Sequence, residues 1–291
     1  MFRFPSKIWL PAGGGLGDIV RCYLRDEPHW GYLKTLHEQQ PDIKIKVVST
    51  SHNPEVPALF KHTPFIDEVK ELGWMMDGRT VAASEAHGYT PISSIISHLQ
   101  NLRHFPPEFY LDEEDKKIYD SIVSKGRYIF VHPFAIRAAL PLEEFIPMFD
   151  RLIDEHGFNI VVIGASHTRT ARKGAIGPHD PGGKLFVKEE LTYERPGLFN
   201  LANKCNVRTA MQLCATADRF LGHCSCYNIV AWIKGIKSFI FSPPDQKLFL
   251  ATSRTHAWPL IDRLPWCKNV FSDEWTSPRD AANQAIQFLG E

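Results

Sequence analysis

Residues 7–20 read KIWLPAGGGLGDIV, and they set a pattern that recurs along the chain. The apolar run KIWLPA predicts a short buried strand, and the glycines after it predict a loop that opens a helix from about Asp18 to Gln39 or Gln40. The next segment, DIKIKVVSTS (42–51), is rich in β-branched residues and predicts a second strand. A strand, a helix and another strand in this order indicate a βαβ unit with a parallel sheet.

The second half of the chain shows the same alternation after the charged segment 111–127. Helices are predicted at 141–157, 207–218, 227–235 and 277–291, where a serine and a proline open the last one. The strands predicted between them are YIFVHPF (128–134), NIVVIGAS (159–166), RFLGHCS (219–225) and KSFIFSP (237–243). We therefore expect an α/β protein with two Rossmann-like domains whose parallel sheets face a central cleft.

Composition limits the classes of function that the chain can serve. It has 291 residues, with 33 basic and 33 acidic side chains, so a strongly electrostatic nucleic-acid binder is disfavoured, although a local basic groove is not. No apolar run reaches the roughly 18–20 residues that span a bilayer, and no signal peptide is evident. Six cysteines are too few for a disulfide scaffold. We expect a cytoplasmic protein with reduced thiols.

The aspartate at the end of the glycine loop has two possible roles. Asp18 stands where the helix should begin, so its carboxylate could cap the first turn. A carboxylate at the carboxyl edge of a parallel sheet could equally act as a general base. The residues by themselves leave both roles open.

Two other motifs give only weak indications, one of a dinucleotide-binding loop and one of a zinc site. Read from Gly13, the third glycine of a dinucleotide-binding G-x-G-x-x-G would fall on Asp18, and no acidic residue ends the next strand, so a nicotinamide cofactor is disfavoured. The segment GHCSC (222–226) holds one histidine and two cysteines, but its C-x-C spacing is unusual for a zinc site, and the sequence has no matching C-x-x-C pair elsewhere. We expect no metal and no cofactor.

Three stretches together resemble the ADP-heptose:lipopolysaccharide heptosyltransferases, which form glycosyltransferase family 9 with the two-domain GT-B architecture. The first is the loop GGGLGDIV at 13–20, and the second runs from YIFVHPF to NIVVIGAS. The third runs from LFNLANKC through GHCSC to FIFSPP (198–244) and places Gly222 and Gly235 where the family has two glycines. The three stretches follow the order of the family and cover most of the chain.

The resemblance implies a division of the chain and a chemistry. Residues 1–115 would bind the acceptor, residues 116–275 would bind a nucleotide sugar, and a helix at 276–291 would pack back on the first domain. The family is inverting and metal-independent, and its loop aspartate, here Asp18, acts as the base on the acceptor hydroxyl. The backbone at Gly14, Gly15 and Gly17 would then shape the acceptor cleft.

The donor loop departs from the family pattern. Where the family has Asp-Ser-Gly and a later histidine, this chain has Cys224, Ser225, Cys226 and Ile229. The residues that the resemblance assigns to the donor are His132, Arg137, His223, Ser225 and Asn228. Arg137 is the nearest cation to the family's basic position, and its guanidinium suits phosphate oxygens.

The sequence therefore predicts a glycosyltransferase that uses a nucleotide-diphosphate sugar and needs no other cofactor. The expected acceptor is a glycan, a lipid-linked sugar or modified DNA. The altered loop at 224–229 also allows a non-catalytic protein of the same fold that only binds a nucleotide or a sugar.

Overall fold

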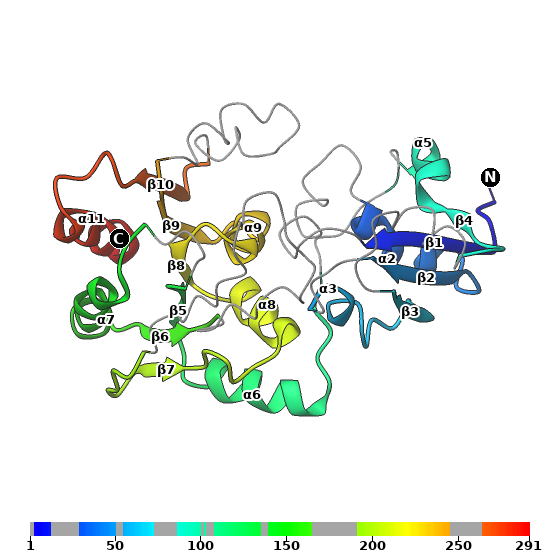
Figure 1. Cartoon of the computed structure of the whole chain (residues 1–291). Helices are drawn as coiled ribbons and strands as arrows, with labels where there is room; N and C mark the ends of the chain where they lie inside the picture. The colour runs from blue at the N-terminus through cyan, green and yellow to red at the C-terminus, as the bar shows by residue number, and fades with distance from the viewer. Residues whose placement is uncertain are drawn as a thin grey trace. The chain divides into compact units, whose positions relative to one another are not determined.

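The computed structural model describes the chain in nine ranges: 3–12, 29–50, 55–72, 86–99, 102, 108–134, 139–164, 191–244 and 264–291. The chain divides into two compact units, Met1–Asp112 and Glu113–Glu291 (Figure 1). Five of the predicted site residues lie outside the described ranges, namely Gly14, Gly15, Gly17, Asp18 and Arg137.

The first unit holds a four-stranded parallel sheet in the order β3-β2-β1-β4. Its strands are β1 (Lys7–Ala12), β2 (Lys44–Ser49), β3 (Glu68–Glu71) and β4 (Thr90–Pro91). Its helices are α2 (His29–Gln39), α3 (Glu55–Ala58), the 3-10 turn η1 (Ile92–Ile95) and α5 (Ile96–Leu99). Alternation along β1 buries Ile8 and Leu10 on one face, while Trp9 packs with Val48 on the other.

The second unit holds a six-stranded parallel sheet in the order β10-β9-β8-β5-β6-β7. Its strands are β5 (Tyr128–His132), β6 (Asn159–Val162), β7 (Leu198–Asn200), β8 (Arg219–His223), β9 (Lys237–Ser242) and β10 (Cys267–Phe271). Its helices are α6 (Glu113–Val123), α7 (Phe145–Asp154) after the turn η2 (Leu142–Glu144), α8 (Val207–Ala215), α9 (Cys226–Ile233) and α11 (Pro278–Gly290).

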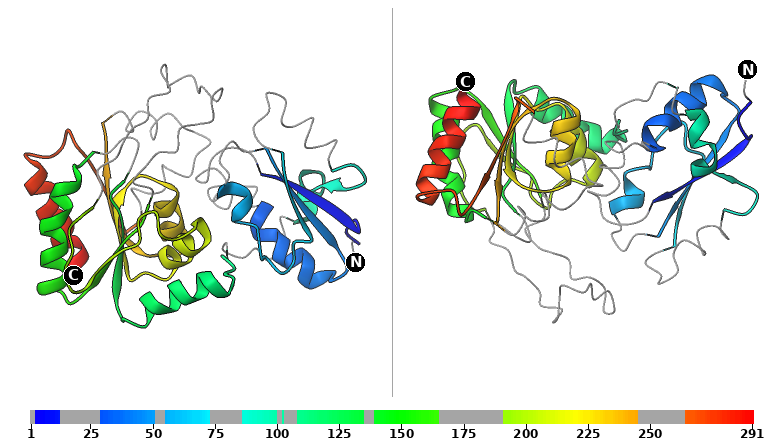
Figure 2. Two further views of the ribbon diagram at one scale, coloured as in Figure 1. Left: turned by 60° about the horizontal axis from the view of Figure 1, so that its bottom comes forward. Right: turned by 90° about the horizontal axis from the view of Figure 1, so that it is seen from above.

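Helices cover both faces of the second sheet, as a parallel sheet requires. Figures 1 and 2 show α7 and α11 together on one face and α8 and α9 on the other. The α7 face encloses the main core, in which Phe145 and Phe149 pack on Val131, Leu221 and Phe239.

The C-terminal helix α11 is defined by its own sequence. The Ser277 hydroxyl accepts a hydrogen bond from the Asp280 amide, and Pro278 occupies the first turn. Its apolar stripe, with Ala285 and Leu289, is buried in the core of the second unit, where the helix packs on α7 and β9. Contact of this helix with the first unit remains a prediction.

A buried ion pair fixes α6 to the second unit directly after the division between the units. Arg208 donates to Asp115 Oδ2 at 2.7 Å, and the two side chains are 7% and 5% exposed. Asn206 caps α8 by accepting from the Thr209 amide, and its amide group also donates to Asp115. The charge pattern of 111–127 does not by itself predict this buried pair.

The strands and helices predicted from periodicity are confirmed wherever the structure describes them. Two parallel sheets flanked by helices confirm the α/β class. The short strands β4, β7 and β10 were not predicted, because they lie at sheet edges and mix polar with apolar residues.

Candidate functional site

The carboxyl ends of β5 and β8 bring the predicted donor residues of the second unit together. The strands pair in parallel so that His132, the last residue of β5, lies opposite Gly222. His223 ends β8, and α9 begins three residues later at Cys226. The structure thus gathers His132, His223, Ser225 and Asn228 at one edge of the sheet, where ligands bind in open α/β folds.

Close packing explains the glycine in this motif. A Cβ at Gly222 would overlap the backbone carbonyl of His132, and residue 222 has a φ of +156°. Only glycine lets the two strands approach this closely at their ends.

The His132 side chain points toward α9. Its ring lies 5.0 Å from the Tyr227 ring, at an interplanar angle of 55°. On another side it meets the backbone of Gly164, which follows β6. The residue is 8% exposed, so its ring is held in place by packing. Sequence reasoning missed Gly164 and Tyr227, although a glycine directly after a buried strand is a signal for close approach.

Ser225 and Asn228 build the N-terminus of α9. Ser225 is the extended N-cap residue, and its backbone amide donates to Asn228 Oδ1 at 2.5 Å. Asn228 is fully buried. Within the described part of the chain, its Nδ2 has no hydrogen-bond partner. The N-terminus of a helix and a buried amide donor make this corner suited to an anion.

His223 lies in a different environment. Its Nε2 faces the Leu140 carbonyl at 3.2 Å, and its Nδ1 lies 3.4 Å from the Ala139 amide nitrogen. Phe145 packs edge-on against the ring, with 5.5 Å between ring centroids, and the residue is 1% exposed. Both ring nitrogens are therefore occupied by backbone groups of the segment that precedes α7.

The two cysteines that flank Ser225 behave as neutral packing groups. Burial raises the pKa of Cys224 and that of Cys226 to about 12, so both thiols stay protonated at neutral pH. Among the residues that the structure describes, no three histidine, cysteine or acidic side chains are grouped in a way that could hold a metal ion.

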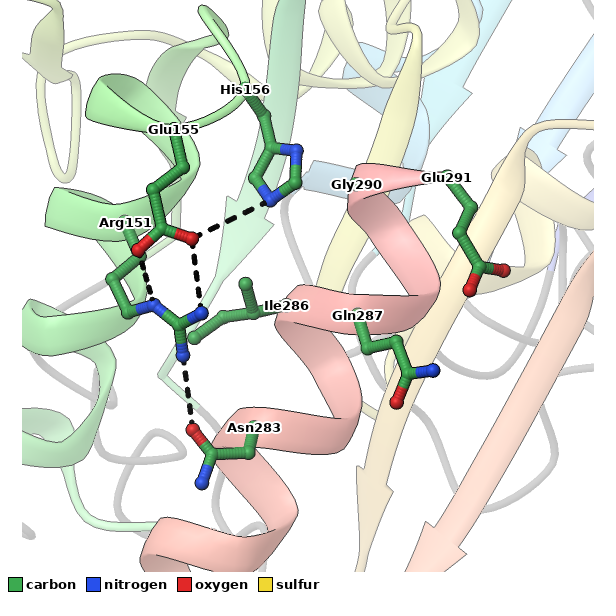
Figure 3. Close-up of a pocket in the computed structure, with 8 residues that line it drawn as sticks. All are labelled: Arg151, Glu155, His156, Asn283, Ile286, Gln287, Gly290 and Glu291. Carbon is green, nitrogen blue, oxygen red and sulfur yellow. Dashed lines mark hydrogen bonds and ion pairs between the residues drawn. The ribbon is translucent and has the colours of Figure 1, made fainter.

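A hollow of about 490 Å³ lies between the C-terminal ends of α7 and α11 (Figure 3). Arg151 donates to both oxygens of Glu155 at 2.7 and 3.0 Å and to Asn283 at 3.1 Å. The His156 ring lies against Gly290, where a Cβ would overlap it. Arg151, Glu155 and Asn283 thus pair with one another, and these contacts indicate packing of α7 on α11.

Comparison with solved structures identifies the architecture. A glycosyl transferase of family 9 from Veillonella parvula superposes with a TM-score of 0.59 at 10% identity, covering 99% of this chain and 98% of that one. The ADP-heptose lipopolysaccharide heptosyltransferase II of Escherichia coli gives 0.59 at 13% identity, covering 97% and 98%. The chain has the GT-B fold. No family model and no curated protein matches the sequence.

The GT-B fold confirms the resemblance drawn from the sequence at the level of architecture. In this fold the edge that carries His132, Ser225 and Asn228 belongs to the second of the two α/β units. None of the described helices is long and apolar enough to cross a membrane.

Proposed function

We propose that this chain is an inverting glycosyltransferase that moves a sugar from a nucleotide-diphosphate sugar to an acceptor hydroxyl without a metal ion. One observation carries the proposal. In a GT-B fold, the carboxyl edge of the second sheet carries His132 and the N-terminus of α9, where Asn228 Nδ2 is buried with no hydrogen-bond partner among the described residues.

The donor diphosphate is held mainly by neutral dipoles in this proposal. The first amides of α9 point at the phosphate oxygens, and the helix dipole favours their negative charge. Asn228 Nδ2 donates to one of these oxygens, and Arg137 supplies the cation. His132 contacts the donor from the end of β5. His223 acts as a positioning residue, because its ring holds the backbone at Ala139 and Leu140.

The chemical step is a single displacement. Asp18 takes the proton of the acceptor hydroxyl while the acceptor oxygen forms a bond to the anomeric carbon of the donor. The bond from that carbon to the diphosphate oxygen breaks, and the nucleoside diphosphate leaves with the electron pair. Attack from the opposite face inverts the anomeric centre. The backbone amides at the N-terminus of α9 stabilise the negative charge that develops on the departing nucleoside diphosphate.

The candidate site supports a donor class, and the acceptor class is a proposal. We propose a nucleoside diphosphate sugar as donor, in line with the ADP-heptose named for the E. coli protein of the same fold. The neutral Cys224 in the donor loop favours a sugar that does not need a carboxylate contact at this position. A hydroxyl of a glycan or of a lipid-linked sugar is the proposed acceptor.

Thermal melting with a panel of nucleoside diphosphates and nucleotide sugars tests donor binding, because a bound ligand must raise the melting temperature. Asn228→Asp keeps the oxygen that accepts from Ser225 but replaces the amide donor with a negative oxygen. It should weaken nucleotide binding by about tenfold or more, the value of a hydrogen bond to a charged group. Asn283→Asp makes the same chemical change in an exposed residue of α11 and should leave binding unchanged.

Asp18→Asn then separates binding from turnover. It should abolish sugar transfer while the nucleotide still raises the melting temperature as in the wild type. Transfer at the wild-type rate would remove Asp18 from the mechanism. If no nucleotide at millimolar concentration shifts the melting temperature, the donor site and the transferase proposal are both wrong.

A further inference from the structure

One row of paired residues across the second sheet places a polar side chain on the same face as His132. His132 of β5 lies opposite Gly222 of β8. Gly222 in turn lies opposite Ile240 of β9, and Ile240 lies opposite Asn269 of β10. Residues that pair in a parallel register point to the same face of a sheet. The side chains of His132 and Asn269 therefore share a face, and three strand spacings of about 4.8 Å separate them by roughly 14 Å.

Helix α9 covers this face between the two side chains. It packs on β8 and β9, the two strands that separate β5 from β10. On the β5 side, the His132 ring lies 5.0 Å from the ring of Tyr227, the second residue of the helix. On the β10 side, Trp232 Nε1 donates to the Sγ of Cys267, two residues before Asn269, at 3.0 Å. His132 and Asn269 therefore lie on opposite flanks of the helix whose N-terminus is the proposed diphosphate site.

The Asn269 side chain is oriented so that its amide nitrogen is available. Ser242, the last residue of β9, is 1% exposed, and its hydroxyl donates to Asn269 Oδ1 at 2.8 Å. This bond turns the amide oxygen toward Ser242. The Asn269 Nδ2, with two N–H donors, makes no hydrogen bond within the described part of the chain, and the residue is half-buried. The protein thus fixes an amide donor that it does not itself use.

The two flanks of α9 differ in chemistry. On the β5 flank, the rings of His132 and Phe134 both border the backbone of Gly164, and Tyr227 packs on His132. On the β10 flank, Ser242 and Asn269 offer a hydroxyl and an amide. Flat nucleobases stack on aromatic side chains, whereas the hydroxyl groups of a sugar need hydrogen-bond partners. The base and the sugar of a nucleotide sugar extend from its diphosphate in different directions, so the β10 flank suits the sugar.

Given a donor diphosphate at the N-terminus of α9, as in the proposed function on which this inference rests, we propose that Asn269 contacts the hydroxyl groups of the transferred sugar. Its Nδ2 donates to sugar oxygens, and Ser242 is the positioning residue that orients the amide. Asn228 binds the diphosphate that all donors share, whereas Asn269 takes part in selecting the sugar.

Isothermal titration calorimetry of the whole 291-residue chain tests the proposal with three matched pairs of probes. These are ADP with ADP-glucose, UDP with UDP-glucose, and GDP with GDP-mannose. The wild type should bind both members of at least one pair. Asn269→Leu is close in volume but has no donor, so it should weaken binding of that nucleotide sugar about three- to tenfold, the range for one hydrogen bond. Its affinity for the diphosphate alone should stay at the wild-type value.

Two further variants separate contact with the sugar from a general defect. Ser242→Ala leaves the Asn269 amide in place without its orienting bond, so it should weaken binding of the nucleotide sugar by a smaller factor and spare the diphosphate. It also guards against a folding defect specific to Asn269→Leu. Asn283→Leu makes the same chemical change at an exposed position of α11 and should leave both affinities unchanged.

The outcomes distinguish this inference from the proposed function. If the wild type binds none of the six probes, the proposed function is overturned and this inference with it. If the wild type binds a diphosphate but no nucleotide sugar, or if Asn269→Leu weakens neither member of a pair or both members equally, the diphosphate site stands. In each of these cases the role of Asn269 in binding the sugar is overturned.

Discussion

The ring of His132 lies in contact with the backbone of Gly164: a Cβ built on residue 164 would stand 2.9 Å from His132 Cδ2 and 3.1 Å from Nε2. The two residues end neighbouring segments, β5 and the turn after β6, so a change in one acts directly on the other. The His132 ring therefore packs between residues of two segments, Gly164 after β6 and Tyr227 of α9.

Gly164→Ala should therefore displace the His132 ring. We expect a lower melting temperature and a nucleotide affinity reduced about tenfold, because the ring and the new methyl group cannot share this space. Gly157→Ala serves as the control, since residue 157 also has a positive φ, +68°, but open space around it. The control should lose about 1–2 kcal/mol from backbone strain and keep its nucleotide affinity. Equal affinities in both variants would contradict a role of this contact in the site.

Asp115→Ala should be strongly destabilising. It leaves the buried guanidinium of Arg208 without its carboxylate, and breaking such a pair costs about 3–5 kcal/mol. Chemical denaturation monitored by circular dichroism measures the loss. Asp120→Ala removes the same side chain from an exposed position of the same helix and should change the free energy of unfolding by less than about 0.5 kcal/mol. Similar effects of the two substitutions would show that the buried pair does not secure α6.

Stability should depend on pH through the contact of Arg195 with α7. Arg195 donates to Asp154 at 2.6 Å, and this hydrogen bond holds the pKa of the Asp154 carboxyl below its usual value. A lowered carboxyl pKa stabilises the fold above the unfolded value near 3.8, and the effect is lost as pH falls through the lowered pKa. The melting temperature of Arg195→Gln should therefore lie below that of the wild type at pH 7, and the gap should narrow below about pH 4. A gap that is constant with pH would contradict this assignment.

The thiols of Cys224 and Cys226 should react slowly. Burial raises the pKa of each to about 12, so little thiolate exists at neutral pH. Iodoacetamide at pH 7.5, followed by mass spectrometry, should modify both residues far more slowly than it modifies the same cysteines in urea-unfolded protein. Labelling of the folded chain as fast as that of the unfolded chain would show that the thiols are accessible and ionised.

The sequence by itself determined the elements of this protein and their order. Apolar runs such as residues 128–132 predict buried strands, and the spacing of Phe145, Met148, Phe149 and Leu152 predicts the helix that covers them. The cap at Ser277 and Pro278 predicts the start of the last helix. These signals are local. Apolar side chains that repeat every two residues in a strand, or every 3.6 residues in a helix, already specify which side chains share the buried face.

Only the tertiary structure decided what individual residues at the strand ends do. The sequence reading gave His132 and His223 the same donor role. In the register of the sheet, His132 lies opposite Gly222, and His223 is the next residue of that strand. Successive side chains of a strand point to opposite faces, so the side chains of His132 and His223 lie on opposite faces of the sheet. His132 meets Tyr227 of α9, whereas His223 is enclosed beside Phe145 of α7. Arg219, Lys237 and Lys268 likewise lie on neighbouring strands only because strand order and register bring distant residues together.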